Sequence, residues 1–178
     1  MSTLTRLSSG LALLCGSLVW ALSSFSADAA SITTQPRCTG PSGYCLSFGS
    51  ADTIPVIRSF NFTAPKAGTA QVTFHGSLYC GISTNTTTFA RIDLVSQIVD
   101  RKNAVPDLSK AGSLRHAAGY TSNNTFHGWS TSFSLASTRV FTISAAGTQR
   151  YYFKIERLLQ DANVTCYVYN ATFTIVFI

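Results

Sequence analysis

The sequence has few charged residues, a single methionine and no long stretch of helical periodicity. Asp, Glu, Lys and Arg make up only 11% of the chain against 46% hydrophobic residues, so most of the polar surface must come from Ser, Thr and Asn. After residue 30, apolar residues do not recur at the three- and four-residue spacing of a long amphipathic helix. This absence argues against all-α and α/β folds.

Carboxylates and catalytic motifs are scarce as well. The chain has 13 Lys+Arg and 7 Asp+Glu; Arg6 and Asp28 lie in the N-terminal leader described below, so 12 and 6 remain. There is no closely spaced carboxylate pair suited to glycoside hydrolysis, no Gly-x-Ser-x-Gly elbow, no His-Glu-x-x-His motif and no glycine-rich phosphate loop. We therefore predict that the protein is not an enzyme, and keep an extracellular hydrolase as a third alternative.

Nucleic-acid and metal binding are not expected either. Basic residues are scattered, with Arg101-Lys102 the one basic pair in a row, whereas nucleic-acid proteins cluster Lys and Arg on one face. There is no Cys-x-x-Cys and no histidine beside a cysteine, so a zinc site is not indicated. Nothing in the sequence calls for a cofactor.

The first 29 residues read as a cleaved signal peptide. One basic residue, Arg6, precedes the apolar run Leu11–Leu22, and Ala27-Asp28-Ala29 places small residues where signal peptidase cleaves. The run is shorter than the ~20 residues needed to span a bilayer. We therefore expect an exported protein, secreted or periplasmic and not an integral membrane protein, with residues 30–178 forming a single domain.

Four cysteines remain in the exported part: Cys38, Cys45, Cys80 and Cys166. An even number in an oxidising compartment predicts two disulfides, for which three pairings exist. We favour Cys38–Cys45, because the intervening "TGPSGY" is rich in turn residues, which leaves Cys80–Cys166.

Short stretches of period-two alternation predict strands. Residues 72–80, 151–155, 164–168 and 173–177 each place apolar side chains on one face and polar ones on the other. Residues 89–102 fit either a helix or a bulged strand, and the β-branched neighbours favour the strand. Many strands without intervening helices predict an all-β, two-sheet antiparallel sandwich, jelly-roll-like and stabilised by disulfides.

Two segments of the chain echo each other: Phe62–Phe74, "FTAPKAGTAQVTF", and Phe141–Phe153, "FTISAAGTQRYYF". In each, Phe-Thr would end a strand, Ala-Gly would turn, and the next strand would run to the closing Phe. Gly68 and Gly147 are the residues expected to take a positive φ. We interpret both copies as hairpins or sheet-crossing corners, so the echo reports architecture and not a repeated functional device.

Residues 100–130 form an aperiodic insert, and long stretches of this kind are often functional. A glycan or protein ligand is predicted to bind here through basic, amide and aromatic side chains: Arg101, Lys102, Tyr120, Asn123, Asn124, His127 and Trp129. The alternative for Trp129 is a place in the core. A second patch is expected from Tyr152, Tyr167 and Tyr169 if they share one face.

Three short stretches resemble known families. "ATFTIVFI" at residues 171–178 resembles the last strand of chaperone–usher pilins, although Thr165 lies where those proteins carry glycine. "CLSFG" at residues 45–49 is similar to the start of spore-coat-U-like secreted domains, and "FTAPKAG" to a hairpin of tumour-necrosis-factor-type jelly rolls.

These observations lead to one prediction of function and one main alternative. The prediction is a secreted, non-enzymatic β-sandwich with a structural or extracellular binding role. The pilin resemblance implies the alternative, a pilus or surface-assembly subunit that donates or accepts a strand, and either interpretation is compatible with an oligomer.

Overall fold

The computed structural model describes residues 30–38, 43–54, 56–82, 89–121 and 129–178. The predicted signal peptide and three of the predicted binding residues, Asn123, Asn124 and His127, lie outside these ranges. Ten strands follow in order: β1 (Ser31–Thr34), β2 (Leu46–Gly49), β3 (Val56–Ala64), β4 (Gly68–Ile82), β5 (Phe89–Val99), β6 (Leu114–Thr121), β7 (Trp129–Ser134), β8 (Ser137–Ile143), β9 (Gly147–Gln160) and β10 (Thr165–Phe177). None of the described residues belongs to a helix that could cross a lipid bilayer.

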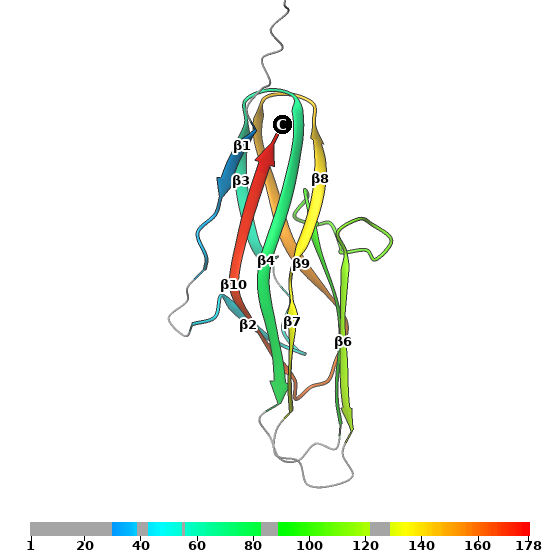
Figure 1. Ribbon diagram of the computed structural model, residues 1–178. Helices are drawn as coiled ribbons and strands as arrows, with labels where there is room; N and C mark the ends of the chain where they lie inside the picture. The colour runs from blue at the N-terminus through cyan, green and yellow to red at the C-terminus, as the bar shows by residue number, and fades with distance from the viewer. Residues whose placement is uncertain (1–29, 39–42, 55, 83–88, 122–128) are drawn as a thin grey trace, which may run out of the picture.

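The strands form two antiparallel sheets packed face to face (Figure 1). Sheet A has the order β1-β10-β4-β7, with β2 also pairing with β10 and β8 with β4. Sheet B has the order β3-β9-β5-β6. The prediction of an all-β, jelly-roll-like antiparallel sandwich with two disulfides is confirmed.

The core lies between the sheets and is built by the predicted alternation. On β4 the side chains of Val72, Phe74 and Leu78 are fully buried. Phe74 stacks on Phe153 of β9 with ring centroids 3.7 Å apart, which joins sheet A to sheet B, and Phe173 of β10 meets Phe74 edge-on at 5.1 Å. The alternate residues between them, such as Thr73 and His75, therefore face outward from sheet A.

Strand β10 changes its inward-facing residues halfway along. Cys166 and Val168 are buried in its first half, and Phe173 and Ile175 in its second, so the parity switches from even to odd. The switch occurs at a bulge between Tyr169 and Thr172, where Asn170 has a φ of 54°. One bulged strand thus accounts for two stretches of the sequence that alternate out of phase.

Strand β5 settles the helix-or-strand question in favour of the bulged strand, with its register shift between Asp93 and Leu94. Its inner face carries a buried polar pair, because Ser96 Oγ lies 2.8 Å from His116 Nε2 of β6. The His116 ring packs edge-on against Phe133 of β7 at 5.4 Å, so the pair sits between the two sheets.

The two echoing segments are corners where the chain crosses between sheets. The first joins β3 of sheet B to β4 of sheet A, and the second joins β8 of sheet A to β9 of sheet B. The corners lie side by side at one end of the sandwich, since Ala64 pairs with Gly147 and Gly68 with Ile143 (Figure 1).

The two corner glycines serve different purposes. Gly147 has a φ of 142°, as expected, but Gly68 is not among the residues with positive φ. A Cβ on Gly68 would lie 2.5 Å from the carbonyl oxygen of Ile178 and 2.6 Å from the Phe177 ring. The expectation of a positive φ at Gly68 was therefore wrong, because this glycine makes room for the end of β10.

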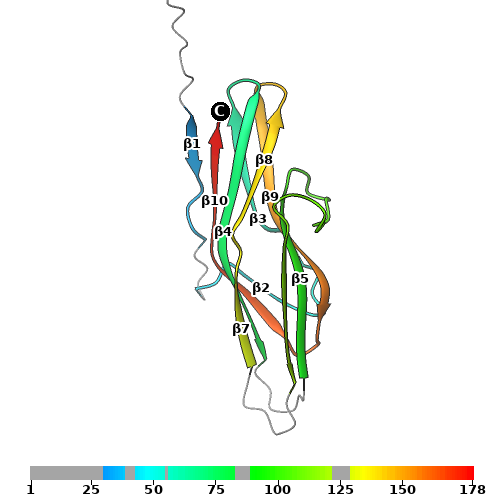
Figure 2. The same ribbon diagram turned by 45° about the vertical axis from the view of Figure 1, so that its right-hand side comes forward.

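The segment before β2 closes the edge of β10 (Figure 2). Strand β1 pairs with residues 174–177, and backbone amides of Gln35 and Cys38 donate to the carbonyls of Phe173 and Ala171. From sheet B, the Arg58 guanidinium donates to the carbonyls of Pro36 and Ala171. All four side chains of β1 are exposed, so backbone bonds alone hold that strand.

Both predicted disulfides are present, Cys38–Cys45 and Cys80–Cys166. The second joins directly opposed residues of β4 and β10, and both cysteines are fully buried. Cys38–Cys45 closes the loop that leads the chain from the β10 edge into β2.

The insert at 100–130 contains β6, which showed no periodic signal in the sequence, and the start of β7. Two side chains of sheet B hold the loop before β6 in place by hydrogen bonds. Gln97, which is buried, accepts from the Asp107 amide at 3.2 Å, and Lys154 Nζ donates to the carbonyls of Lys102 and Ala104 at 3.0 and 2.6 Å.

Candidate ligand-binding face

Four tyrosines gather on the outer face of sheet A. Tyr79 lies on β4, Tyr167 and Tyr169 lie on β10, and Tyr44 reaches over from the loop closed by Cys38–Cys45. Tyr44 meets Tyr167 and Tyr169 edge-on, with centroids 5.1 and 6.3 Å apart, and Tyr79 lies 6.3 Å from Tyr167. We call these four residues the tyrosine face.

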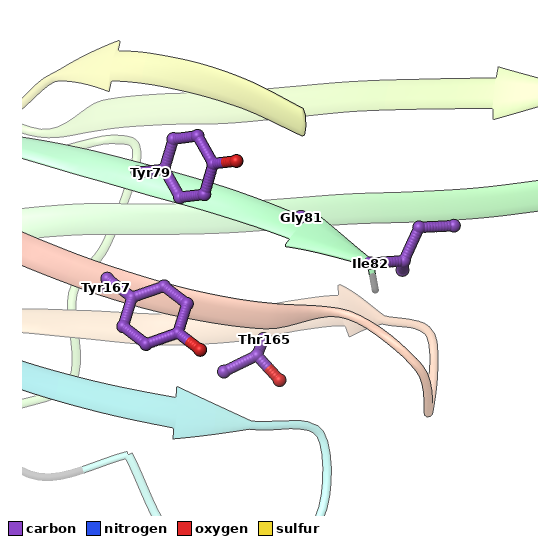
Figure 3. A pocket seen from close by; sticks show the side chains of 5 residues that line it. All are labelled: Tyr79, Gly81, Ile82, Thr165 and Tyr167. Carbon is purple, nitrogen blue, oxygen red and sulfur yellow. The ribbon is translucent and has the colours of Figure 1, made fainter. Parts of the chain in front are cut away.

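A hollow of about 240 Å³ opens at one end of the tyrosine face. It is lined by Tyr79, Gly81, Ile82, Thr165 and Tyr167 (Figure 3). We call it the tyrosine hollow. Its geometry follows from cross-strand register: Tyr79 is directly opposite Tyr167, and Gly81 is directly opposite Thr165. The missing side chain at Gly81 leaves the space beside the two rings.

Backbone packing requires the glycine at position 81. A Cβ there would lie 2.8 Å from the carbonyl oxygen of Trp129 and 3.3 Å from Cβ of Ser130, both on the neighbouring β7. The Tyr79 hydroxyl would be 3.5 Å away from it. The close approach of β7 therefore keeps the floor of the hollow open.

The polar groups of the hollow are hydroxyls. Figure 3 shows the Tyr79 and Tyr167 hydroxyls pointing along the strands toward the end where Gly81 and Thr165 lie. Neither these two hydroxyls nor that of Thr165 has a hydrogen-bond partner among the described residues. Flat ring faces bordered by unsatisfied hydroxyls suit a ligand that is apolar on one face and rich in hydroxyls at its rim.

The structure separates the residues predicted from the insert. Arg101 and Lys102 follow the end of β5, whereas Tyr120 pairs with Ala90 at its start, about 30 Å away along the strand. Tyr120 and Trp129 are half-buried and pack against the core. The backbone carbonyl of Trp129 lies close to Gly81, but Trp129 itself does not line the tyrosine hollow.

The expected second patch is divided between the sheets. Tyr167 and Tyr169 do share the outer face of sheet A, but Tyr152 lies on β9 of sheet B, beneath the Arg150 guanidinium at 5.4 Å. Tyr44 and Tyr79, which the sequence did not single out, take part instead. The predicted Cys80–Cys166 bond was the signal that could have found Tyr79, because opposed cysteines place their flanking residues opposite one another.

None of the six carboxylates of residues 30–178 lines the tyrosine hollow. Asp93 binds Arg115 at 2.9 and 2.6 Å, and this hydrogen-bonded ion pair lowers the pKa of Asp93. Asp161 faces Arg91 at 3.4 Å. Two pairs each line one hollow together: Asp52 and Glu156 between the β2–β3 connection and β9, and Asp100 and Asp107 in the loop before β6.

The nearest approach to a catalytic arrangement is the buried pair Ser96–His116. Burial lowers the pKa of His116, so its imidazole is neutral at pH 7 and accepts or donates one hydrogen bond to Ser96. The two residues are 0% and 4% exposed, so no substrate reaches them. Among the described residues, no group of three or more His, Cys, Asp or Glu side chains is placed to hold a metal ion.

The similarities between this chain and known proteins are distant. No protein-family model matches the chain, and no curated protein matches it in sequence. Solved structures that resemble it include the infectious bursal disease virus Gx strain (9% identity, TM-score 0.39), T=1 particles derived from infectious bursal virus (10%, 0.37) and a VP2 subviral particle of infectious bursal disease virus (11%, 0.34). Each alignment covers 84% of this chain, and this chain spans about a third of theirs: 32%, 32% and 33%. These similarities are too distant to bear on function, which rests on the residues of this chain alone.

Proposed function

We propose that the protein is an exported, non-enzymatic binding domain that retains an extracellular glycan on its tyrosine face. The observation that carries the proposal is the opposed pair Tyr79–Tyr167 beside the gap at Gly81. The C–H bonds on one face of a sugar ring carry partial positive charge and match the negative face of an aromatic ring. The hydroxyls of Tyr79, Tyr167 and Thr165 are placed to bind the hydroxyls at the rim of the sugar.

The size of the hollow favours one unit of a polymer over a whole small-molecule ligand. Drug-sized ligands occupy pockets of roughly 300–1,000 Å³. At about 240 Å³, the tyrosine hollow accepts a group of about the size of one sugar ring, with the rest of the chain lying over the sheet.

Binding without turnover is favoured by the chemistry of the same residues. The tyrosine hollow is lined by no carboxylate, histidine or cysteine, so it lacks the carboxylate pair of most glycoside hydrolases and a thiol nucleophile. Export is supported by the two disulfides, which persist in oxidising compartments.

The proposal is tested with the exported chain, residues 30–178, on a glycan array followed by titration of the best oligosaccharide. We expect Tyr79→Ala and Tyr167→Ala to weaken binding about tenfold, which corresponds to loss of ~1.4 kcal/mol of ring stacking. Tyr152→Ala is the matched control on the opposite sheet and should leave binding unchanged. Equal affinity in all four proteins would refute the proposal.

The same samples discriminate the alternatives. Shortening of the oligosaccharide on incubation, detected by mass spectrometry and lost in a variant of either carboxylate pair (Asp52→Asn or Glu156→Gln, Asp100→Asn or Asp107→Asn), would favour the hydrolase. An assembly subunit is the second candidate, favoured by the exposed edge strand β1. It would appear in light scattering as polymers that disappear when residues 31–34 are deleted, whereas the binding domain is expected to be a monomer or small oligomer.

A further inference from the structure

A second hollow lies on the same two strands as the tyrosine hollow. Its volume is about 230 Å³, and it is lined by Arg37, His75, Gly76, Ser77, Asn170 and Thr172. His75 is opposite Thr172, and Ser77 is opposite Tyr169 of the tyrosine face. Tyr79 and His75 are four residues apart on β4, so the two hollows lie about 13 Å from one another.

The bulge in β10 and the segment along its edge shape this second hollow. Asn170 occupies the bulge, with its side chain exposed. The Cys38 amide donates to the Ala171 carbonyl at 3.2 Å, and Thr172 Oγ1 donates to the Gln35 carbonyl. These two bonds hold residues 35–38 against the bulge and bring Arg37 to the rim.

Arg37 gives the second hollow an uncompensated positive charge. Its side chain is exposed, and it forms no ion pair or hydrogen bond with any described residue. The other lining groups are hydroxyls, an amide and an imidazole, and no carboxylate lines either hollow. A guanidinium binds a carboxylate or sulfate through two parallel hydrogen bonds, which a lone hydroxyl does not match.

We propose that the second hollow is an anion subsite, and that the ligand is an acidic oligosaccharide whose carboxylate or sulfate binds Arg37 while a neighbouring sugar lies on the tyrosine face. The inference rests on the proposed function and specifies its ligand. The surface between the hollows is continuous, since Ser77 and Tyr169 pair between them and Tyr44 packs on Tyr169.

The test compares an acidic oligosaccharide with its uncharged form: hexameric oligogalacturonate and its methyl ester. Calorimetric titration of residues 30–178 is expected to give at least tenfold tighter binding of the acid. Arg37→Gln should remove that preference and leave affinity for the ester unchanged. Arg150→Gln, which removes an exposed arginine from β9 of sheet B, is the matched control and should change neither affinity.

Each further result decides between the two proposals. If acid and ester bind equally, or if Arg37→Gln weakens both alike, the anion subsite is refuted; the glycan proposal survives in that case if Tyr79→Ala weakens both. Binding of neither oligosaccharide, when the array has yielded a neutral glycan that depends on Tyr79, refutes the anion subsite alone; an array without any bound glycan contradicts both proposals. Arg37-dependent binding of inorganic sulfate without binding of the hexamer would show a small-anion site and refute the bridging ligand. Thermal unfolding of every variant confirms that it is folded.

Discussion

At the scale of single residues, Gly81 links packing to function. An added Cβ would meet the Trp129 carbonyl at 2.8 Å, so β4 and β7 would have to move apart. We expect Gly81→Ala to lower the free energy of unfolding by about 1–3 kcal/mol, the usual range for overpacking.

Gly119→Ala on β6 is the control for this substitution. Its Cβ would find its nearest neighbour, Cγ of Arg91, at 3.6 Å, which is ordinary contact. Urea unfolding should show little change or a small gain for Gly119→Ala, since alanine restricts the unfolded chain. Equal losses in the two variants would mean that the approach of β7 does not determine the residue at position 81.

At the scale of elements, the pair Ser96–His116 makes the contact of β6 with β7 sensitive to pH. Burial lowers the pKa of His116 in the folded protein, whereas the imidazole of the unfolded chain has a pKa of ~6.5. Below about pH 6.5 the unfolded state therefore binds more protons than the folded state, and the free energy of unfolding falls as the pH decreases. Above that pH both states hold neutral imidazole, and the contribution is constant.

Urea unfolding at pH 7.5 and 5.0 measures this effect. We expect the native chain and His75→Gln, which alters an exposed histidine, to lose stability over the interval. His116→Gln should lose less. Asp93 does not contribute to the change in stability between pH 7.5 and 5.0. Arg115 lowers the pKa of Asp93, so the stability that this ion pair supplies is lost only below about pH 4. An identical loss in His116→Gln would assign the pH dependence elsewhere.

The strands were predictable where one face is buried and the other is exposed to solvent, because apolar and polar residues then alternate along the sequence. Residues 72–80 and 151–155 are examples. Strand β6 was not, since the three residues at its centre, Ala117, Ala118 and Gly119, are small on both faces. The bulge at Asn170 was not predicted either, because it requires a positive φ that no pattern in the sequence indicates.

Most residues of the candidate site could not be predicted from the sequence, for a physical reason. Aromatic residues in an aperiodic stretch suggested a binding loop, yet Tyr120 and Trp129 pack against the core. The tyrosine face depends on the register of β4 with β10 and on the loop that brings Tyr44 over them, which are tertiary features. Of these, only the register was accessible, through the Cys80–Cys166 bond.

At the scale of the whole molecule, the two disulfides should contribute unequally to stability. Loop-closure entropy assigns about 4–5 kcal/mol to Cys80–Cys166, with a sequence separation of 86, and about 2–3 kcal/mol to Cys38–Cys45, with a separation of 7. We expect the Cys80→Ala/Cys166→Ala variant to lose more free energy of unfolding than Cys38→Ala/Cys45→Ala. The reverse order in denaturant midpoints would contradict this expectation.

The pairing of Ser31 with Phe177 gives the molecule a particular response to mechanical force. Tension applied at residues 30 and 178 pulls two adjacent antiparallel strands apart from their ends, so their hydrogen bonds break one after another and not together. The force then passes from residue 80 to residue 166 through the disulfide. Residues 81–165, and with them all of β5 to β9, bear no load while that bond is oxidised, and Tyr79 and Tyr167 are the last loaded residues before it.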